Sequence, residues 1–211
     1  MKKLDLRKQL AHLYNPSARE PALVDVPAMT FACIDGRGDP NGPDFAAATG
    51  ALYAFSYTIK FLVKKERAID YPVMALEGLW SVEGKADFSH GDYNTRDAWL
   101  WTLMIMQPDA AAPELWPMAL EQAARRGTPW LERLHFERFD EGRSAQVMHI
   151  GPYSTEPATV DRLHNFIRAQ GLWPRGRHHE IYLGNPLRSA PDKLKTVLRH
   201  PVEPASKSDC G

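Results

Sequence analysis

The stretch that decides the fold is RSAQVMHIGPYSTEPATVDRLHNFIRAQG, residues 143–171. Its first part, 143–153, is largely apolar and runs into a Gly-Pro turn signal, which predicts a strand. Residues 154–171 then place apolar side chains at the three- and four-residue spacing of an amphipathic helix. Two strand-like segments, EIYLGNP (180–186) and LKTVLRHPV (194–202), follow. The segment therefore predicts a strand–helix–strand–strand unit.

A carboxylate stands in the second strand of this unit, HHEIYLGNP (178–186). Side chains alternate between the two faces of a strand, so Glu180 and Tyr182 point to the same face. If the strand end is exposed, this pairing is ordinary. If the strand lines a cavity, Glu180 is the most informative residue of the chain. The strand alone leaves both interpretations open.

The first half of the chain repeats the same order. An apolar segment (29–40) ends in a Gly/Asp/Pro cluster, an Ala-rich helical segment (42–65) follows, and two strands are predicted at 71–83 and 98–108. A further helix is expected at 112–127. The repeat predicts an α+β fold with two pseudo-symmetric modules, one antiparallel sheet and a ligand cleft between the modules. A doubly wound parallel sheet is the weaker option, because the chain has no Gly-rich phosphate loop.

The boundaries follow from this repeat. We expect one domain over 1–211, with an N-terminal arm at 1–20, modules at 21–127 and 128–203, and a loose tail at 204–211. A length of 211 residues is sufficient for a sizeable core.

Composition excludes little but favours a globular protein. The chain is 44% hydrophobic and 25% charged, and its 26 basic and 26 acidic side chains give no support to nucleic-acid binding. Neither a signal peptide nor a membrane-spanning apolar run is evident, so we expect a cytoplasmic protein.

Cysteines and histidines give no metal signal. Cys33 and Cys210 predict no disulfide framework, and no Cys/His spacing is typical of zinc ligands. His178 and His179 precede the Glu180 strand, but neighbours on a strand point oppositely and are poor joint ligands. We therefore expect no metal and no cofactor.

Segments 148–172 and 178–202 together resemble the C-terminal half of GyrI-like proteins. These share their fold with effector-binding domains of multidrug-responsive regulators and, more distantly, with SOUL proteins. The N-terminal half, with YPVMALEGLW (71–80), is similar to the stand-alone cytoplasmic branch of the family. The recurring residues are Gly151-Pro152-Tyr153, Glu180-Ile181-Tyr182-Leu183, Pro186, Thr196 and Pro201-Val202.

The resemblance implies two modules related by a pseudo-twofold axis, with a small-molecule cleft in which the acid falls on Glu180. Three family roles follow as expectations: binding of planar drugs, hydrolysis of cyclopropane-bearing genotoxins, and inhibition of DNA gyrase. About 20 residues precede the domain, too few for a helix-turn-helix, so direct DNA binding is not expected.

The candidate residues are aromatic and acidic. Aromatic faces hold planar and cationic ligands, and a carboxylate partly desolvated by them is suited to general acid–base chemistry. The ligand-binding candidates are Glu180, Tyr182, Tyr153, Tyr53, Tyr57, Glu77, Trp80, Trp99 and Trp101; if the protein is a hydrolase, Glu180 is the expected general base and Tyr153 a hydrogen-bond donor.

Alternatives stand beside several of these residues. Glu77 is either a second acid in the cleft or a turn residue before Gly78. Tyr153 is nearly as well explained by a structural hydrogen bond. Trp99 and Trp101 share one strand face, so both line the cleft or both pack under the helices.

We expect first a protein that binds planar, hydrophobic or cationic small molecules for multidrug protection. A hydrolase of cyclopropanoid electrophiles is the alternative, and a gyrase inhibitor is the least favoured. The expected partners are small planar ligands, with no membrane and no identified protein partner.

Overall fold

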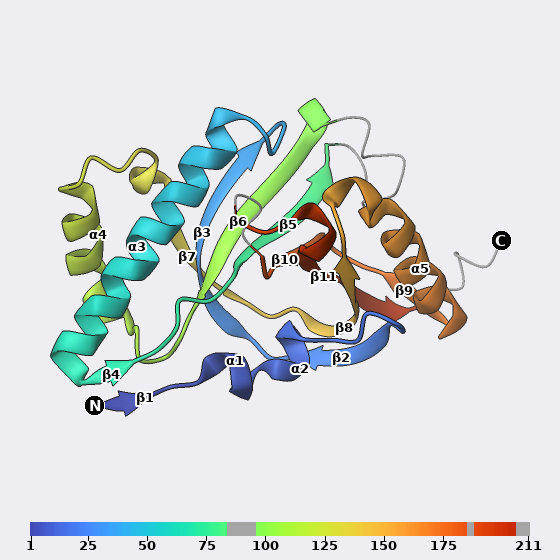
Figure 1. Cartoon of the computed structure of the whole chain (residues 1–211), viewed down its shortest axis with the longest axis horizontal. Helices are drawn as coiled ribbons and strands as arrows, with labels where there is room; N and C mark the ends of the chain where they lie inside the picture. Colours follow the sequence, from blue (N-terminus) through green and yellow to red (C-terminus); the bar gives the residue numbers. More distant parts are fainter. Residues whose placement is uncertain (84–95, 185–187, 206–211) are drawn as a thin grey trace.

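A nine-stranded antiparallel sheet organises the protein (Figure 1). The structure is a computed structural model, and it describes residues 1–83, 96–184 and 188–205. Eight strands form one path and β9 (Leu172–Pro174) pairs with β11 at its side. Along the path the strands are β2 (Ala22–Val26), β8 (Gly142–Ile150), β11 (Lys195–Pro204), β10 (His178–Tyr182), β5 (Leu76–Val82), β6 (Trp99–Gln107), β3 (Met29–Arg37) and β7 (His135–Phe139). The predicted α+β class with one joined sheet is confirmed.

The strand order is symmetric about its centre. The chain runs β3–α3–β5–β6 in its first half and β8–α5–β10–β11 in its second, with α3 at Pro43–Arg67 and α5 at Glu156–Ala169. The third element of each unit, β5 or β10, lies at the middle of the sheet, and these two strands pair with each other. This is the predicted strand–helix–strand–strand plan, repeated.

The two units exchange their outer strands. β2 directly precedes β3 in the sequence but pairs with β8 of the other unit. β7 precedes β8 but pairs with β3. Each unit therefore contributes a strand to its partner's edge, and the two halves interlock beyond the contact between β5 and β10.

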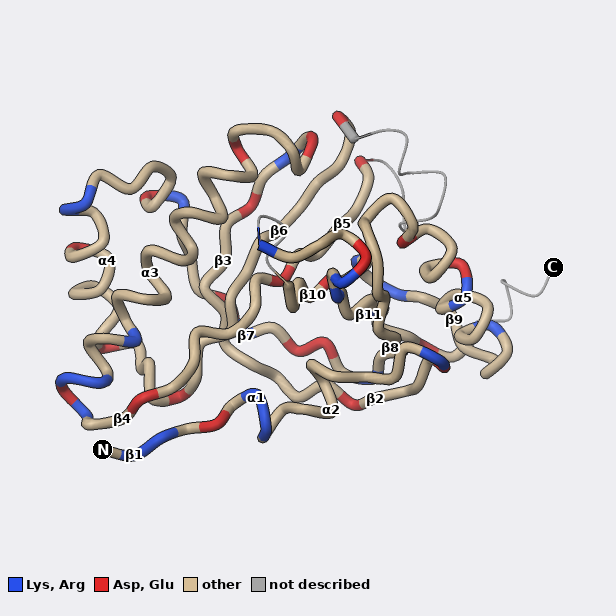
Figure 2. Tube along the Cα trace, viewed as in Figure 1, with Lys and Arg blue, Asp and Glu red and all other residues tan. Residues whose placement is uncertain are grey.

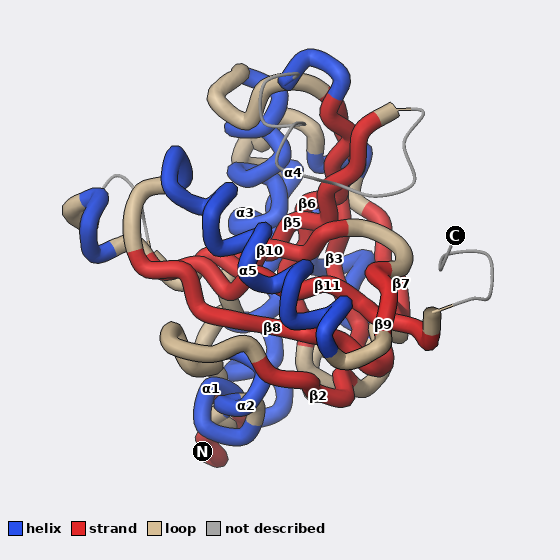
Figure 3. The backbone as a smooth tube through the Cα atoms, turned by 90° about the vertical axis from the view of Figure 1, so that its right-hand side faces the viewer, coloured by secondary structure: helices blue, strands red, loops and turns tan. Residues whose placement is uncertain are grey.

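Both long helices cover the same face of the sheet (Figures 1 and 3). Helix α3 packs on β3 and β6, and α5 packs on β8 and β11. Helix α3 begins at Pro43, which is favoured in a first turn, and buries a stripe that includes Ala51, Phe55 and Ile59. The buried stripe of α5 is Val160, Leu163 and Ile167.

By length and composition, α3 is apolar enough to cross a membrane, but half of its most apolar window is buried inside the protein. Its packing on the sheet is that of a core helix.

Smaller elements complete the fold. The N-terminal arm forms β1 (Lys2–Lys3), α1 (Leu6–Gln9) and α2 (Ala11–Tyr14), and β1 pairs with β4 (Ile69–Asp70). Helix α4 (Trp116–Ala124) packs beside α3. Short 3-10 helices precede β6, α4, β7, α5 and β11, at Arg96–Ala98, Pro113–Leu115, Leu131–Arg133, Tyr153–Thr155 and Pro191–Lys193.

The face of the sheet away from α3 and α5 holds a buried charge network. The Tyr14 hydroxyl donates to Glu77 Oε1 at 2.6 Å, and Glu77 Oε2 lies 3.0 Å from His179 Nε2. The other ring nitrogen of His179 lies 3.0 Å from Glu141 Oε1, and Arg199 donates to Glu141 Oε2 at 3.1 Å. Because both ring nitrogens of His179 face carboxylates, the imidazole is doubly protonated.

The charges in this network shift two pKa values strongly. Burial alone would lower the pKa of His179, but Glu141 and Glu77 raise it to about 9. Burial alone would raise the pKa of Glu141, but His179 and Arg199 lower it to about 2. Arg199 also donates to the carbonyl of Leu13 at 2.6 Å. The network therefore ties the N-terminal arm to the centre of the sheet.

We expect Glu141→Gln to lower the free energy of unfolding by about 3–5 kcal/mol, because it leaves two buried cations without their shared counter-ion. Urea unfolding measures this loss. Glu132→Gln, at an exposed glutamate in the 3-10 helix Leu131–Arg133, is the control and is expected within about 0.5 kcal/mol of the wild type. A loss under about 1 kcal/mol for Glu141→Gln would contradict the structural role.

The network also predicts a pH dependence. The raised pKa of His179 contributes stability that is present below its ordinary value of 6.5 and is lost as the pH rises through about 9. The lowered pKa of Glu141 contributes stability that is present above 4.5 and is lost as the pH falls towards about 2. The difference in unfolding free energy between wild type and Glu141→Gln should thus be larger at about pH 6 than at about pH 10. An equal difference at both values would argue against a charged His179.

Candidate functional site

The candidate site lies on the helix-covered face, over β5 and β10, with α3 on one side and α5 on the other (Figure 1). In the antiparallel register His178 lies opposite Trp80, Glu180 opposite Gly78 and Tyr182 opposite Leu76. Paired residues point to the same face, so the alternate residues of β10 all face the helices. The α5 side of this face is lined by Val147, Leu198 and the helix's own apolar stripe.

A chain of hydrogen bonds fixes the Glu180 carboxylate. Trp80 Nε1 donates to the Tyr182 hydroxyl at 2.9 Å, and this hydroxyl donates to Glu180 Oε2 at 2.7 Å. These hydrogen bonds pass over Gly78, where an added Cβ would lie 2.8 Å from Trp80 Nε1 and 3.1 Å from the Tyr182 oxygen. Glycine at this position is therefore required by the close approach of the two donors.

The second oxygen of Glu180 faces an imidazole. Glu180 Oε1 lies 3.4 Å from Nε2 of the fully buried His178. Behind His178, its ring meets that of His200 at 5.8 Å between centroids, and His200 Nδ1 lies 3.1 Å from His164 Nε2. Burial lowers the pKa of His200 well below its usual range, and its two histidine neighbours add to the effect. His200 is therefore neutral, and Glu180 is backed by a row of imidazoles.

A second carboxyl group, Glu156, stands beside the first. It is the first residue of α5 and is only 2% exposed. Burial raises its pKa well above the ordinary range, and the negative charge of Glu180 raises it further. Its Oε1 atom has no hydrogen-bond partner in the described part of the chain. Burial and Glu180 therefore favour the protonated form of Glu156, next to an acid that is 7% exposed and bonded to Tyr182.

The Gly151-Pro152-Tyr153 turn positions both Glu156 and Tyr153. Gly151 has φ of 140°, which favours glycine, and the Thr155 hydroxyl closes the turn on the Pro152 carbonyl at 2.8 Å. Tyr153 is 38% exposed, and its ring meets the ring of Tyr182 edge-on at 6.1 Å. Burial of its hydroxyl, and then the proximity of the Glu156 and Glu180 carboxyl groups, raises the pKa of Tyr153 to about 12. Tyr153 thus offers a neutral hydroxyl at the rim of the site.

Aromatic side chains form the α3 side. Phe45, from the first turn of α3, stacks on Trp80 at 5.9 Å, and Trp99 meets Trp80 edge-on at 5.3 Å. Trp101 lies edge-on to Phe45 at 5.4 Å and covers Gly36, where a Cβ would fall 2.0 Å from the indole. Trp99 and Trp101 are both buried, packed against Trp80 and Phe45 respectively.

The remaining candidates divide. Tyr53 packs at the edge of the first core, and the backbone of Leu76, the partner of Tyr182, hydrogen-bonds to it. Tyr57, one turn later, is exposed. Glu77 is neither the second acid of the site nor a turn residue. It lies inside β5 on the opposite face, bonded to Tyr14 and His179, because its odd position in the strand reverses its direction relative to Gly78.

Three residues of the site were not predicted: Glu156, His178 and Phe45. The period-2 alternation that paired Glu180 with Tyr182 also places His178 on the same face, so it was within reach. Glu156 had a weaker signal, an acid opening the helix directly after the Gly-Pro-Tyr turn. Phe45 depends on how α3 crosses the sheet, which the sequence does not indicate.

Comparison with known proteins agrees with this architecture. A family model described as the GyrI-like small molecule binding domain matches residues 19–203. A conserved Listeria innocua protein without assigned function is 40% identical, with 95% of this chain and all of that chain covered and a TM-score of 0.85. A structure described as a hydrolase from Listeria innocua is 39% identical, with coverage of 96% and 100% and a TM-score of 0.83.

More distant likeness concerns the fold alone. The C-terminal domain of EcmrR is 11% identical, with 88% of this chain and 98% of that chain covered and a TM-score of 0.54. No protein with a curated description matches the chain. The family match spans most of the sequence and includes every residue of the site described above, and the chain therefore belongs to the GyrI-like family of small-molecule-binding domains.

Proposed function

We propose that this protein is a hydrolase of hydrophobic small molecules that carry a strained, electrophilic ring. The observation that carries the proposal is the pairing of two buried carboxyl groups in one site: Glu180, bonded to Tyr182, and Glu156, whose pKa is raised by burial and by Glu180. Such a pair provides a base and an acid in one site. Two full-length neighbours, 39% and 36% identical, are described as hydrolases.

The chemistry balances with water as the only co-reactant. Glu180 takes a proton from water, and the water oxygen attacks an electrophilic ring carbon. The ring C–C bond breaks, and its electrons pass to a conjugated carbonyl, whose oxygen accepts a hydrogen bond from Tyr153. Glu156 protonates the resulting enolate, and the proton on Glu180 then returns to Glu156. The product is the ring-opened alcohol, and both acids recover their initial states.

The substrate class follows from the surroundings and from the family resemblance. The partly exposed rings of Phe45 and Tyr153 favour planar apolar molecules, and a cyclopropane conjugated to a carbonyl provides both the strain and the electron sink. The same surroundings support the second candidate, capture of planar cations without turnover for multidrug protection. Acidic and basic residues are interspersed along the described chain (Figure 2), so charge gives no support to gyrase inhibition through DNA mimicry.

We expect Glu180→Gln to lower kcat/KM for a planar cyclopropanoid ketone by about 10²–10⁴-fold, because the amide cannot accept the proton of water. Product formation, followed as a mass gain of one water, measures this. Binding of the same compound, followed by tryptophan fluorescence, should change little. Glu203→Gln, an exposed glutamate on β11, is the matched control. Unchanged turnover in Glu180→Gln would exclude the proposed base.

Glu156→Gln tests the acid separately. The amide matches the size of the neutral acid but transfers no proton, so kcat should fall by about 10²-fold while the affinity for substrate is retained. In the wild type, activity should also decline at alkaline pH as Glu156 loses its proton. If Glu156→Gln leaves kcat and its pH profile unaltered, Glu156 is only a structural acid. If the wild type binds planar cations but yields no product from any strained-ring compound, capture without turnover replaces the hydrolase.

A further inference from the structure

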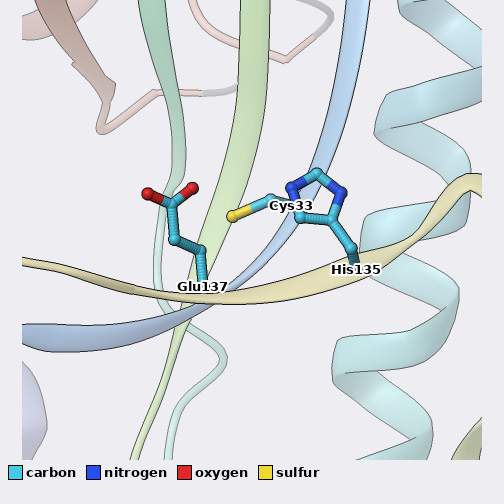
Figure 4. Close-up of side chains that lie close together, drawn as sticks. All are labelled: Cys33, His135 and Glu137. Atoms are coloured by element: carbon cyan, nitrogen blue, oxygen red, sulfur yellow. The ribbon is translucent and has the colours of Figure 1, made fainter.

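A second cluster of reactive side chains lies on the other face of the sheet, at its β7 edge. Cys33 of β3 lies directly opposite His135 of β7 in the register, and Glu137 is two residues further along β7. Residues two apart on a strand share a face, so all three side chains converge (Figure 4). Their nearest ligand atoms, the thiol sulfur, an imidazole nitrogen and a carboxylate oxygen, all lie within 4.8 Å of one another.

The donor set and its spacing fit a transition metal. A thiolate, an imidazole and a carboxylate are the ligands that zinc takes in proteins. Metal–ligand distances of about 2.0–2.3 Å place the ligand atoms of one tetrahedral zinc roughly 3–4 Å apart. Contraction from the observed spacing therefore needs only side-chain rotation, because both strands already present the groups to one point.

The charges around the cluster favour a cation. Asp35, two residues beyond Cys33 on the same face, places Oδ2 3.8 Å from His135 Nε2. Arg177 opposes this charge through Thr102, whose hydroxyl accepts from Arg177 at 2.7 Å and donates to Asp35. Two carboxylates against one guanidinium leave the site net negative.

One ligand of the cluster is buried, and the other two are open to solvent. Cys33 is buried, whereas the side chain of His135 is 43% exposed and Glu137 lies at the surface. The thiolate is the form that binds a metal, so binding releases the thiol proton of Cys33. An ion can approach from the edge strand.

We propose that Cys33, His135 and Glu137 bind a divalent metal ion of the zinc class, with water or Asp35 in the fourth position. No sequence motif predicts this site, because Cys33 lies far in the sequence from His135 and Glu137. The site lies on the opposite face from Glu180, so it is separate from the proposed hydrolase centre and independent of it.

Cobalt titration tests the proposal, because Co²⁺ bound by a thiolate gives a charge-transfer absorption that carboxylate or imidazole ligands do not give. The protein is used with Cys210→Ser, which removes the other cysteine. We expect the thiolate band to saturate at one ion per chain and to disappear when Zn²⁺ is added. Zinc should also raise the melting temperature of this protein.

Three variants in that background locate the site. Cys33→Ser should abolish the thiolate band, and His135→Gln and Glu137→Gln should each weaken cobalt binding at least about 10-fold. Glu137→Gln removes an exposed side chain, so it keeps the test valid if the buried Cys33→Ser variant fails to fold. His12→Gln, at an exposed histidine, is the control. Absence of the thiolate band in the parent protein, or unchanged affinity in Glu137→Gln, would overturn the proposal.

Discussion

Strands β5 and β10 pair at the centre of the sheet with Gly78 opposite Glu180, and this register determines what each face of the protein contains. Along β10, even-numbered residues point to α3 and α5 and odd-numbered residues point away. Glu180 therefore enters the site, while its neighbour His179 enters the charge network on the other side. A shift of one residue would exchange the two sets, burying the site acid among Arg199 and Glu141 and placing a charged imidazole among aromatic rings.

The network on the second face makes that register costly to change. His179 is held between Glu77 and Glu141, and Arg199 shares Glu141, all within the protein interior. Buried charges of this kind contribute little net stability, but each depends on its partners being in place. Their effect here is to fix how β10 meets β5 and β11, and the N-terminal arm closes over them through Tyr14. The position of Glu180 is thus set from the opposite side of the sheet.

Local sequence patterns predicted the two strand–helix–strand–strand units, but they did not predict the contacts between these units. The strand–helix–strand–strand order and the shared face of Glu180 and Tyr182 follow from periodicity and turn residues, which are local. The short strand β2 and the exchange of β2 and β7 between units depend on long-range pairing. The error on Glu77 has the same origin: a strand pattern gives alternation, but only the register says which face meets the helices. Glu156 likewise comes close to Glu180, and Cys33 to His135, only because segments far apart in the sequence pack together.

The arrangement of the acids distinguishes the two candidate activities on physical grounds. Capture of a cation is strongest when both carboxyl groups are charged, yet burial and Glu180 raise the pKa of Glu156 and so disfavour its charged form. Trp80, Trp99 and Trp101 are already buried against one another and Phe45, so little of their surface is free for stacking on a ligand. A general binding site would benefit neither from an acid with a raised pKa nor from tryptophans that are packed against one another. An acid–base pair requires an acid with a raised pKa, because one carboxyl group must give a proton while the other accepts one. The acid–base pair also benefits from the packed tryptophans, because they hold Trp80, and through it Tyr182 and Glu180, in a fixed position.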